Sequence, residues 1–354
     1  MQKILGILVG GGPAPGINGV ISAATIEATN NGFKVLGLLD GFKHIARNDT
    51  SHIVDLTIDI VSRIHFQGGS ILRTSRENPT KSKEKMGNVI SSLSRLGISH
   101  LLTIGGDDTL FTSSTISAFS KETNIDIKFV HVPKTIDNDL PLPGNMPTFG
   151  FETARHVGTM IVQNLMEDSR TTGRWFIVVM MGRSTGHLAL GVGKAAGATI
   201  TLIPEEFPDD VEIDTVCTVL EGAIIKRLSM GRDHGVAIVA EGIAEKLSDK
   251  DLSTLGEMKR DEHGHIKLAE IDFAEVLKRK VEASLNKKGI NVKIMNKNIG
   301  YELRSANPIP FDAEYTRNLG FGAVDFLLKG GTDALVTIWG GSIQAIPFTE
   351  IIDP

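Results

Sequence analysis

The chain has 354 residues, of which 41% are hydrophobic and 22% charged, so it can bury a large core, and its length predicts two domains or one elaborate α/β unit. Its 37 Lys and Arg residues against 42 Asp and Glu residues give a net charge of -5 with no long basic run, which argues against a nucleic-acid partner. The single cysteine, Cys217, cannot form an internal disulfide and is predicted to be a small core residue of a helix, in a protein kept in a reducing compartment.

The first apolar run, Ile4–Val9, resembles the start of a short signal sequence, but Gly10-Gly11-Gly12-Pro13 ends it after a few residues. Elsewhere in the sequence, uninterrupted apolar stretches stay below the roughly 18 residues that a membrane-spanning helix needs. We therefore expect a soluble, cytoplasmic protein without a membrane partner.

Short β-rich runs alternate with longer helical runs along the chain. The first part predicts strands at Ile4–Val9, Val35–Leu39, Leu101–Ile104 and Phe129–Val132, and helices at Asn18–Asn30, Thr109–Lys121 and Gly150–Ser169. The second part predicts strands at Phe176–Met181, Val236–Ala240, Asn291–Ile294 and Leu335–Trp339, and helices from Thr185, over Asp272–Asn286 and over Glu314–Leu328. This order predicts crossover connections and a parallel sheet. Candidate domain seams are Leu140–Gly144 and Pro204–Asp210, although Pro-rich segments also serve as rigid loops inside one domain.

A glycine cluster, Gly10–Gly19, follows the first strand and opens the first helix, where backbone amides can approach an anion closely. It lacks the Lys of a Walker A loop, because Ile17 follows Gly16, and it has Pro15 where the dinucleotide fingerprint needs Gly. On this segment alone, tight strand–helix packing and phosphate contact remain equal alternatives.

Two later segments, Gly105-Gly106-Asp107-Asp108-Thr109 and Pro133-Lys134-Thr135-Ile136-Asp137-Asn138-Asp139, each close an apolar run. Carboxylates are thus delivered where buried strands end, which is the edge at which open α/β sheets bind ligands. Mg²⁺ is usually shared between one or two carboxylates and phosphate oxygens, so four carboxylates and a lysine there suit a magnesium-phosphate substrate. The pattern favours phosphoryl transfer.

With all segments in place, the chain resembles the phosphofructokinase family from its amino terminus to about residue 345. The matching runs are Gly11–Asn18, Gly68–Leu72 leading to Thr74–Arg76, Ile104–Thr109, Pro133–Asp139, Met181–Arg183, Ala240–Gly242 and Gly300–Arg304. The resemblance implies two three-layer α/β domains with mainly parallel sheets. It assigns residues 1–145 plus roughly 303–345 to donor binding, and residues 146–302 plus the C-terminal tail to sugar-phosphate binding.

The resemblance also implies roles at the reaction centre. Asp137 would take the proton of the sugar C1 hydroxyl as its oxygen attacks phosphorus, and Asp107 would hold Mg²⁺ against the donor phosphates. Thr135 and Asp139 would help to place substrate and metal. For an isolated Asp after a strand, a helix N-cap or Asx-turn is the simpler interpretation; Asp137 and Asp107 together favour the catalytic one.

For the sugar phosphate, the resemblance implies that Arg183 and Arg304 hold the substrate and that Glu241 accepts sugar hydroxyls, because the planar fork of Arg donates bidentately to phosphate. Met181, Gly182 and Tyr301 belong to the same binding set, while Arg174 and Lys297 would reach across a subunit interface, so a homodimer or homotetramer is implied. The alternatives are a solvated loop charge for Arg174, a strand-end turn residue for Glu241, and an ion pair with Glu302 for Arg304.

Donor choice rests on Asp108 and Lys134, because ATP users of the family have Gly at both positions and pyrophosphate users have Asp and Lys. An Asp side chain fills and charges the space of a nucleotide's α-phosphate, whereas Gly leaves room for it. Lys134 adds a compact point charge suited to the leaving phosphate. A surface ion pair between the two is the alternative. The remaining implied donor contacts are Gly12, Arg76, Gly106, Asp107 and Thr109.

Three departures from the family pattern stand out. Arg73 replaces a usually small residue just before Arg76, and Gly300–Ser305 reads Gly-Tyr-Glu-Leu-Arg-Ser, so Glu302 brings negative charge near a dianion. The segment Ala244–Leu268 is long and polar and is predicted to be a surface loop, with His263 and His265 spaced as metal ligands in a minor alternative.

These observations predict a reversible, Mg²⁺-dependent glycolytic phosphotransferase that moves a phosphoryl group from pyrophosphate to fructose 6-phosphate, giving fructose 1,6-bisphosphate. The alternatives are the ATP-dependent reaction and a related kinase acting on sedoheptulose 7-phosphate. Small kinases for NAD or diacylglycerol share the Gly-Gly-Asp signature but lack the Thr-Ile-Asp-Asn-Asp run. A non-catalytic binding module is disfavoured by Asp137 and Asp107.

Overall fold

The computed structural model describes residues 2–255 and 272–351, and these fall into two compact units. The first unit takes the chain up to Ile136, Leu140–Thr153 and the segment from Arg304 onward; the second takes Asp137–Asp139 and Ala154–Leu303. The chain therefore passes four times from one unit to the other. The segment from Arg304 lies in the first unit, including residues 346–351, which the sequence analysis groups with the sugar-phosphate domain.

The first unit is built on an eight-stranded sheet with the order β12-β11-β5-β4-β1-β2-β3. The strands are β1 (Ile4–Val9), β2 (Lys34–Leu38), β3 (Ile53–Leu56), β4 (His100–Gly105), β5 (Lys128–Thr135), β11 (Ala334–Trp339) and β12 (Ser342–Pro347), with the two-residue β6 (Phe149–Gly150) beside β5. The five central strands run parallel, and the edge strands β3 and β12 pair antiparallel. Parallel strands need cover on both faces.

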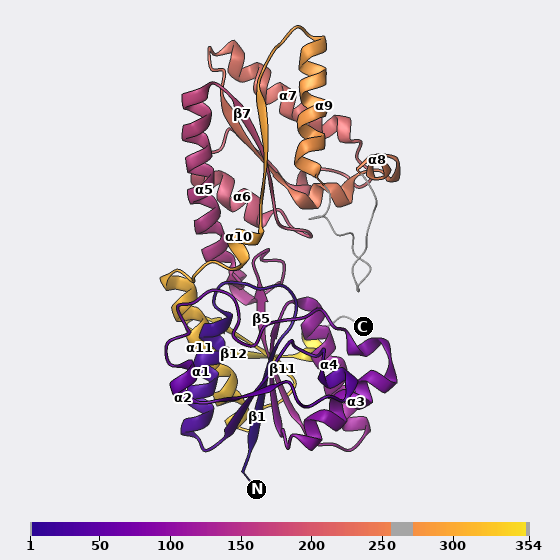
Figure 1. Cartoon of the computed structure of the whole chain (residues 1–354), viewed down its shortest axis with the longest axis vertical. Helices are drawn as coiled ribbons and strands as arrows, with labels where there is room; N and C mark the ends of the chain where they lie inside the picture. Colours follow the sequence, from indigo (N-terminus) through magenta and orange to yellow (C-terminus); the bar gives the residue numbers. More distant parts are fainter. Residues whose placement is uncertain (1, 256–271, 352–354) are drawn as a thin grey trace. The chain divides into compact units, whose positions relative to one another are not determined.

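Helices supply that cover in the first unit (Figure 1). One face carries α1 (Ile17–Asn30), α2 (Ile58–Val61) and α11 (Pro310–Leu328); the other carries α3 (Lys83–Arg95) and α4 (Asp107–Glu122). Short turns complete it, namely η1 (Ile45–Arg47), η2 (Pro79–Lys81), η3 (Pro143–Asn145) and α12 (Phe348–Ile351). An apolar cluster containing Leu8, Leu101, Phe129 and Leu93 fills the space between the sheet and the α3/α4 layer.

The second unit has a four-stranded, entirely parallel sheet with the order β10-β7-β9-β8. Its strands are β7 (Trp175–Met180), β8 (Ile200–Leu202), β9 (Gly235–Ala240) and β10 (Ile294–Ile299). Figure 1 shows α5 (Phe151–Thr172) and α6 (His187–Ala196) on one face, and α7 (Ile213–Ser229) and α9 (Phe273–Lys287) on the other. The shorter elements are η4 (Pro204–Glu206), η5 (Glu241–Lys246), α8 (Asp249–Thr254) and α10 (Tyr301–Arg304). The predicted three-layer α/β architecture with mainly parallel sheets is thus confirmed.

Cys217 lies in α7, where it is 4% exposed, and burial raises the pKa of its thiol to about 12. The predicted core role is confirmed. No helix in residues 2–255 and 272–351 is long and apolar enough to cross a membrane.

The prediction of a surface loop from Ala244 is wrong for the described part of that segment. Ala244, Leu247 and Leu252 are each less than 10% exposed and belong to the apolar core of the second unit, because η5 and α8 fold back onto α7 and α9. Polar residues between these apolar positions hid the helical pattern. His263 and His265 lie outside the described residues.

Candidate active site

The carboxyl ends of β1, β4 and β5 lie side by side in the first unit, because the three strands are adjacent and in parallel register. The glycine cluster follows β1, the Gly-Gly-Asp-Asp run spans the end of β4 and the start of α4, and Lys134-Thr135 closes β5. The structure therefore brings together most of the residues that the sequence analysis assigns to donor binding. We call this edge the donor half-site.

Glycines in the donor half-site are required by close packing around Thr109. A Cβ at Gly10 would lie 2.4 Å from the Thr109 Oγ1, and one at Gly105 would lie 2.3 Å from the Thr109 Cβ. Gly11 has a φ of +78° and donates its amide to the Ser75 carbonyl at 2.9 Å. Packing against Thr109 therefore explains Gly10. Gly11 and Gly12 do not pack against Thr109, so phosphate contact remains the interpretation for these two glycines.

Asp107 and Asp108 are exposed at the first turn of α4. The N-cap is Gly106, which contributes no side chain, and the Asp107 Oδ1 accepts the Asp108 amide at 2.8 Å. Asp107 is therefore not the N-cap that the simpler interpretation of the sequence required. Its carboxylate lies exposed at the positive end of the helix dipole, where carboxylate and phosphate anions are stabilised.

Lys134 is 5% exposed, so it is not the surface lysine that a surface ion pair with Asp108 requires. Its Nζ donates a hydrogen bond to the Gly12 carbonyl. The same glycine approaches a second cation, since a Cβ at Gly12 would lie 2.8 Å from the Arg304 Nη1. Although Arg304 was assigned to the sugar phosphate, the structure brings it to the glycine cluster in the first unit.

Two further cations, Arg73 and Arg76, lie on the loop that contacts the glycine cluster. Thr74 donates its hydroxyl to the Gly11 carbonyl at 2.6 Å, which places the exposed Arg76 two residues away on the same loop. Arg73 has a φ of +56° and its Nη1 lies 3.6 Å from the Asp40 Oδ2. The structure thus gives Arg73 a partner, which the sequence had not provided.

His131 supports the donor half-site from inside the sheet. Its Nδ1 lies 2.8 Å from the Thr103 Oγ1 and its Nε2 lies 3.1 Å from the Gly105 carbonyl oxygen. Full burial lowers the pKa of this histidine to about 3, so the ring is neutral at physiological pH. A neutral ring with Nε2 protonated donates to Gly105 and accepts from Thr103.

The acceptor half-site, as we name it, lies at the carboxyl ends of β7, β9 and β10 in the second unit. Met181 donates its amide to the Ile299 carbonyl at 3.0 Å, and Gly242 donates to the Gly182 carbonyl at 3.1 Å. The Glu241 Oε1 accepts the Gly182 amide at 3.2 Å. Glu241 thereby fixes the loop after β7, in addition to any contact with substrate.

Asp137 also belongs to the second unit, where it is half-buried. Its Oδ2 lies 3.5 Å from the Arg183 amide, at the limit of a hydrogen bond, and its carbonyl accepts the Thr185 hydroxyl at 2.8 Å. The next residue, Asn138, has a φ of +54°, and its carbonyl lies 2.8 Å from the His187 Nδ1. The structure therefore brings Asp137 to the same loop as Arg183.

A pocket in the second unit opens beside this loop. Its lining includes Met181, Glu241, Phe273, Asn298, Tyr301 and Glu302. Glu302 accepts the Gly300 amide at 3.2 Å and lies 3.7 Å from the exposed Lys297, so the negative charge that the sequence placed near a substrate dianion is partly offset. Tyr301 is 62% exposed and can meet a ligand.

Some predicted substrate residues lie elsewhere. Arg174 precedes β7 and therefore lies at the opposite end of that strand from Met181–Arg183. Its Nε donates to the Thr172 hydroxyl at 2.6 Å, and its Nη2 donates to Asp168 at 3.2 Å. Thr135 pairs with Gly150 in the first unit, and Asp139 is in the second. The structure does not bring Arg174 to the acceptor half-site of its own unit.

Sequence reasoning missed residues that hold the acceptor loop. Thr185 and His187 fix the turn at Asp137 and Asn138, and the Glu245 Oε1 lies 3.5 Å from the Arg183 Nε. Thr185 and His187 follow Met181-Gly182-Arg183 directly, so a polar run after a buried strand was the available signal. Glu245 had no such signal, because it lies in the segment interpreted as a loop.

The donor half-site fits a magnesium ion by the chemistry of its ligands. Asp107 offers an exposed carboxylate, and hard cations such as Mg²⁺ are held by one or two carboxylates together with substrate phosphates. Buried Lys134 and the Gly11–Gly12 backbone lie on the same edge and can receive the phosphate oxygens.

Comparisons with known proteins agree with this arrangement. The phosphofructokinase family model matches residues 4–327. The chain is 58% identical over 359 residues to the pyrophosphate–fructose 6-phosphate 1-phosphotransferase of Thermotoga maritima, covering 100% of this chain and 85% of the relative. It is 52% identical to the protein of the same name from Naegleria fowleri, covering 99% and 82%. An ATP-dependent 6-phosphofructokinase of Mycobacterium bovis is 32% identical, covering 98% and 94%.

Solved structures share the fold. A phosphofructokinase of Pichia pastoris in the T-state superposes with a TM-score of 0.79 at 23% identity, covering 99% of this chain and 35% of that one. A pyrophosphate-dependent phosphofructokinase of Marinobacter aquaeolei gives 0.76 at 18% identity, covering 99% and 83%. With the family model spanning most of its length and both half-sites carrying the family's motifs, the chain belongs to the phosphofructokinase family.

Proposed function

We propose that this chain is a transferase that moves a phosphoryl group from pyrophosphate to the C1 hydroxyl of fructose 6-phosphate, reversibly and with Mg²⁺. The observation that carries the donor assignment is the pair Asp108 and Lys134 at the donor half-site, in a chain whose relatives at 58% and 52% identity bear the name of this reaction. The ATP-dependent reaction has weaker support, since the relatives named for it are 30–32% identical.

Pyrophosphate specificity follows from space and charge. Asp108 projects a carboxylate from the first turn of α4, where a nucleotide would need room for its α-phosphate and ribose. Lys134 is buried with its amine at the Gly12 carbonyl, so its charge stays close to the glycine cluster. A fixed ammonium there stabilises the phosphate that leaves, which carries no nucleoside to bind.

The reaction needs a base at the sugar hydroxyl. Asp137 takes the C1 hydroxyl proton while the C1 oxygen forms a bond to phosphorus and the P–O–P bond breaks, releasing phosphate. The Arg183 amide contacts the Asp137 carboxylate, and the Thr185 hydroxyl holds the Asp137 carbonyl. The Arg183 side chain, together with Tyr301, pairs with the substrate phosphate. Asp107 would hold Mg²⁺, which when bound offsets the charge on the transferring phosphoryl group.

The donor assignment is tested by assaying the protein with fructose 6-phosphate and Mg²⁺, with pyrophosphate or ATP offered separately. We expect turnover with pyrophosphate and little with ATP. In the double variant Asp108→Gly/Lys134→Gly, pyrophosphate use should weaken and ATP use should rise, because the side chains that fill the nucleotide space are gone.

The matched control is Asp126→Gly/Lys128→Gly, which removes the same residue types at the opposite end of β5. It should leave the donor preference unchanged. A preference for ATP in the unaltered protein would reject the donor assignment, and unchanged donor kinetics in the Asp108/Lys134 variant would show that these side chains do not choose the donor.

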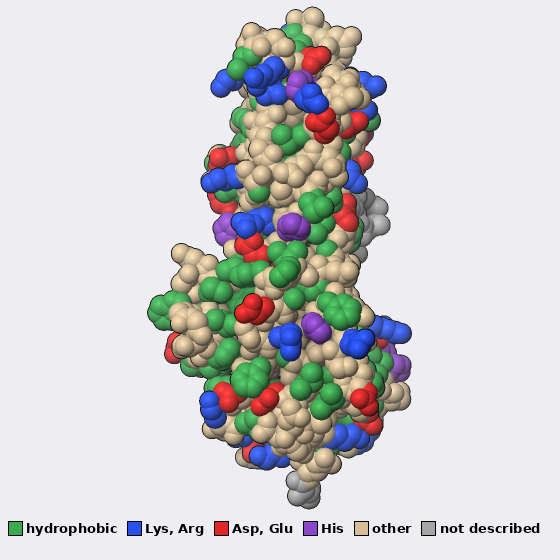
Figure 2. Space-filling view, turned by 90° about the vertical axis from the view of Figure 1, so that its left-hand side faces the viewer, with side chains coloured by type: hydrophobic (Ala, Val, Ile, Leu, Met, Phe, Trp, Pro, Cys, Tyr) green, Lys and Arg blue, Asp and Glu red, His purple; other side chains and the backbone are tan. Residues whose placement is uncertain are grey.

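We also propose that the protein works as a homo-oligomer. Exposed apolar side chains gather over the α2 and α11 layer of the first unit (Figure 2), and they include Ile58, Ile60, Phe66, Phe311 and Phe321. Patches of this kind favour association between copies of a chain. Arg174 lies away from the acceptor half-site of its own unit, as expected of a residue that completes a neighbour's site.

Subunit complementation tests this proposal. Asp137→Asn and Arg174→Ala are each expected to be nearly inactive, and mixing them under subunit exchange should restore part of the activity, because a mixed oligomer contains one site with both residues intact. A monomeric mass in light scattering, or mixed oligomers without recovered activity, would contradict a shared site.

A further inference from the structure

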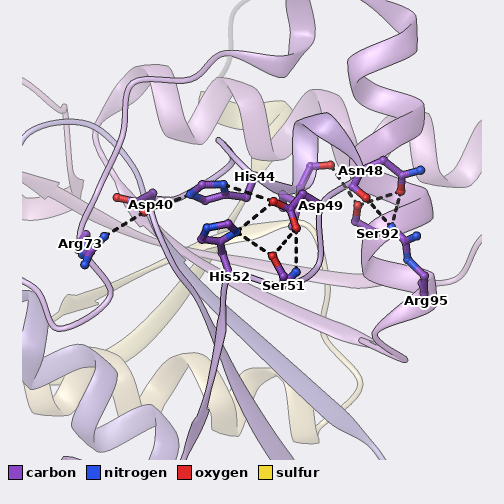
Figure 3. A network of polar contacts seen from close by, with 10 residues as sticks. Asp40, His44, Asn48, Asp49, Ser51, His52, Arg73, Ser92 and Arg95 are labelled. Atoms are coloured by element: carbon purple, nitrogen blue, oxygen red, sulfur yellow. Dashed lines mark hydrogen bonds and ion pairs between the residues drawn. The ribbon is translucent and has the colours of Figure 1, made fainter.

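Two histidines and an aspartate cluster in the first unit, away from the donor half-site. His44, Asp49 and His52 lie on the connection between β2 and β3, and Figure 3 shows their polar atoms turned toward one another. One ligand atom from each residue lies within 4.8 Å of the other two. This is the spacing of side chains that can share a metal ion.

The distances at Asp49 are close to those of a metal centre. The Asp49 Oδ2 lies 3.0 Å from the His52 Nδ1 and 3.9 Å from the His44 Nδ1. A tetrahedral ion bound about 2.0–2.2 Å from each nitrogen and oxygen ligand separates neighbouring ligand atoms by about 3.3 Å. The Asp49–His52 distance is close to this value, and the Asp49–His44 distance exceeds it by about 0.6 Å.

The imidazole rings themselves require one adjustment. They stack with centroids 3.6 Å apart and planes within 4° of parallel, so the nitrogen lone pairs run side by side instead of converging. Binding of one ion by both histidines would therefore require the rings to rotate out of this stack.

An outer layer already orients the cluster. The His44 Nε2 lies 3.2 Å from the Asp40 Oδ2, and Asp40 is in turn 3.6 Å from the Arg73 Nη1. A carboxylate on the far nitrogen of an imidazole fixes the tautomer and raises the basicity of the nitrogen that binds metal. Asp40 thus leaves the His44 Nδ1 as the nitrogen that can bind an ion.

Asp49 is prepared as an anionic ligand with room around it. Its Oδ1 accepts the Ser51 hydroxyl at 2.7 Å and the Ser51 amide at 2.9 Å, which leaves Oδ2 facing the histidines. The side chain is 40% exposed, so water can complete the coordination.

We propose that His44, Asp49 and His52 bind one divalent ion of the zinc class, with Asp40 positioning His44 from the second layer. Two imidazoles and one carboxylate favour such an ion over Mg²⁺ or Ca²⁺, which prefer oxygen ligands. The site is separate from the magnesium-phosphate chemistry of the donor half-site, and its existence does not rest on the proposed function.

Asp40 connects the site to the loop that carries Arg73 and Arg76. The Asp40 amide donates to the Leu72 carbonyl at 3.0 Å, and its carboxylate contacts Arg73, three residues before Arg76. An ion at His44 would therefore act on the Asp40 side chain, which contacts Arg73. This connection assigns Arg73 a role that its sequence position alone did not reveal.

The test is binding of Zn²⁺ to the full, tag-free chain after chelator treatment, with excess Mg²⁺ present to occupy oxygen-only sites. We expect one equivalent to bind, and Co²⁺ in its place to give a visible absorption band typical of mixed nitrogen and oxygen ligation. The double variant His44→Gln/His52→Gln should lose the equivalent and the band. Asp40→Asn should weaken affinity roughly 10–100-fold while keeping the stoichiometry.

The matched control is His234→Gln, because His234 contacts one carboxylate, Asp233 at 3.2 Å, and belongs to no three-residue group of this kind among residues 2–255 and 272–351. Its binding should equal that of the unaltered chain. Thermal unfolding of every metal-free variant checks that each is folded. Absence of Zn²⁺ binding, a full equivalent retained in the double histidine variant, or displacement by an equal concentration of Mg²⁺ would overturn the proposal.

Discussion

At the scale of single residues, Asp137 combines a reactive group with a fixed position. Its half-buried carboxylate meets the Arg183 amide, and its carbonyl is held by Thr185, so both the side chain and the backbone of the proposed base are anchored in the acceptor half-site. A general base must be held in a defined position, and these contacts support the proposed role of Asp137.

Replacing Asp137 with Asn keeps the shape and removes the basic oxygen. We expect Asp137→Asn to lower kcat by about 10²–10⁴-fold, the usual contribution of a general base, with little change in KM for fructose 6-phosphate. Steady-state kinetics measure both quantities. Asp126→Asn, an exposed aspartate at the start of β5, should be indistinguishable from the unaltered protein, and an Asp137→Asn variant with equal kcat would exclude the residue as the base.

His131 gives the native state a proton-dependent stability. Burial holds its pKa at about 3, against 6.5 in an unfolded chain. The unfolded state therefore binds more protons between these values, so the stability from this neutral histidine is complete above pH 6.5 and is lost as the pH falls toward 3. The loss amounts to about 1.4 kcal/mol for each pH unit in that window.

Proton uptake on unfolding tests this directly. At pH 5 the unaltered chain should take up about one proton more than His131→Gln when guanidinium unfolds it, as recorded in a pH-stat. His100, whose pKa burial lowers to about 4, contributes equally to both proteins and cancels in the difference. Identical uptake by the two proteins would mean that His131 is protonated in the native state.

At the scale of elements, the acceptor half-site contains two loops that are in direct backbone contact. A Cβ at Gly242 would lie 2.1 Å from the Arg183 carbonyl oxygen, so the loops after β7 and β9 pack backbone against backbone. Only glycine permits this approach.

Gly242→Ala should push these loops apart and displace Arg183 and Glu241. We expect kcat/KM for fructose 6-phosphate to fall on the order of 10²-fold, as when reacting groups move by about 1 Å. Gly222→Ala provides the control, because its added Cβ in α7 meets no atom within 4 Å. Equal kinetics for the two variants would show that the loop spacing does not matter.

Sequence patterns predicted the buried elements well and the edge elements poorly. The apolar run at Ile4–Val9 coincides with β1, whereas the strand expected at Asn291–Ile294 is found at Ile294–Ile299. β10 is an edge strand that carries Asn296, Lys297 and Asn298, and such polar residues do not resemble a buried strand. The antiparallel edge strand β12, with mostly exposed or half-buried residues, was missed for the same reason.

The candidate sites could be predicted from the sequence where each motif is a short run of residues at the end of a strand. Asp107, Asp108 and Lys134 could be grouped because each lies at the carboxyl end of a strand of the same sheet. The approach of Arg304 to Gly12 joins positions nearly 300 residues apart, and the cluster of His44 with His52 depends on the turn around η1. Neither of these two contacts could be predicted from a regular spacing in the sequence.

At the scale of the whole molecule, the two units differ in how the chain builds them. The second is nearly continuous from Ala154 to Leu303 and has its own apolar core, whereas the first needs α11, β11 and β12 from beyond residue 303. Leu319, Leu335 and Val336 on these late elements are at most 1% exposed. A chain ending before them would leave that part of the core uncovered.

Fragments should therefore behave unequally. Residues 154–303 alone are expected to fold, with a cooperative thermal transition and native-like helix content by circular dichroism, because an independent core defines a domain. Residues 1–153 alone should aggregate or remain without fixed tertiary structure. A folded 1–153 fragment, or an unfolded 154–303 fragment, would contradict this division of the core.

The chain passes into the second unit for just three residues, Asp137–Asp139, and both flanks of that excursion belong to the first. Lys134 and Asp137 are consequently joined by a tether two residues long. In the proposed mechanism, any shift of Asp137 as the sugar phosphate enters or leaves would be transmitted through peptide bonds to Lys134. Lengthening this connection by one residue should therefore uncouple the binding of the two substrates.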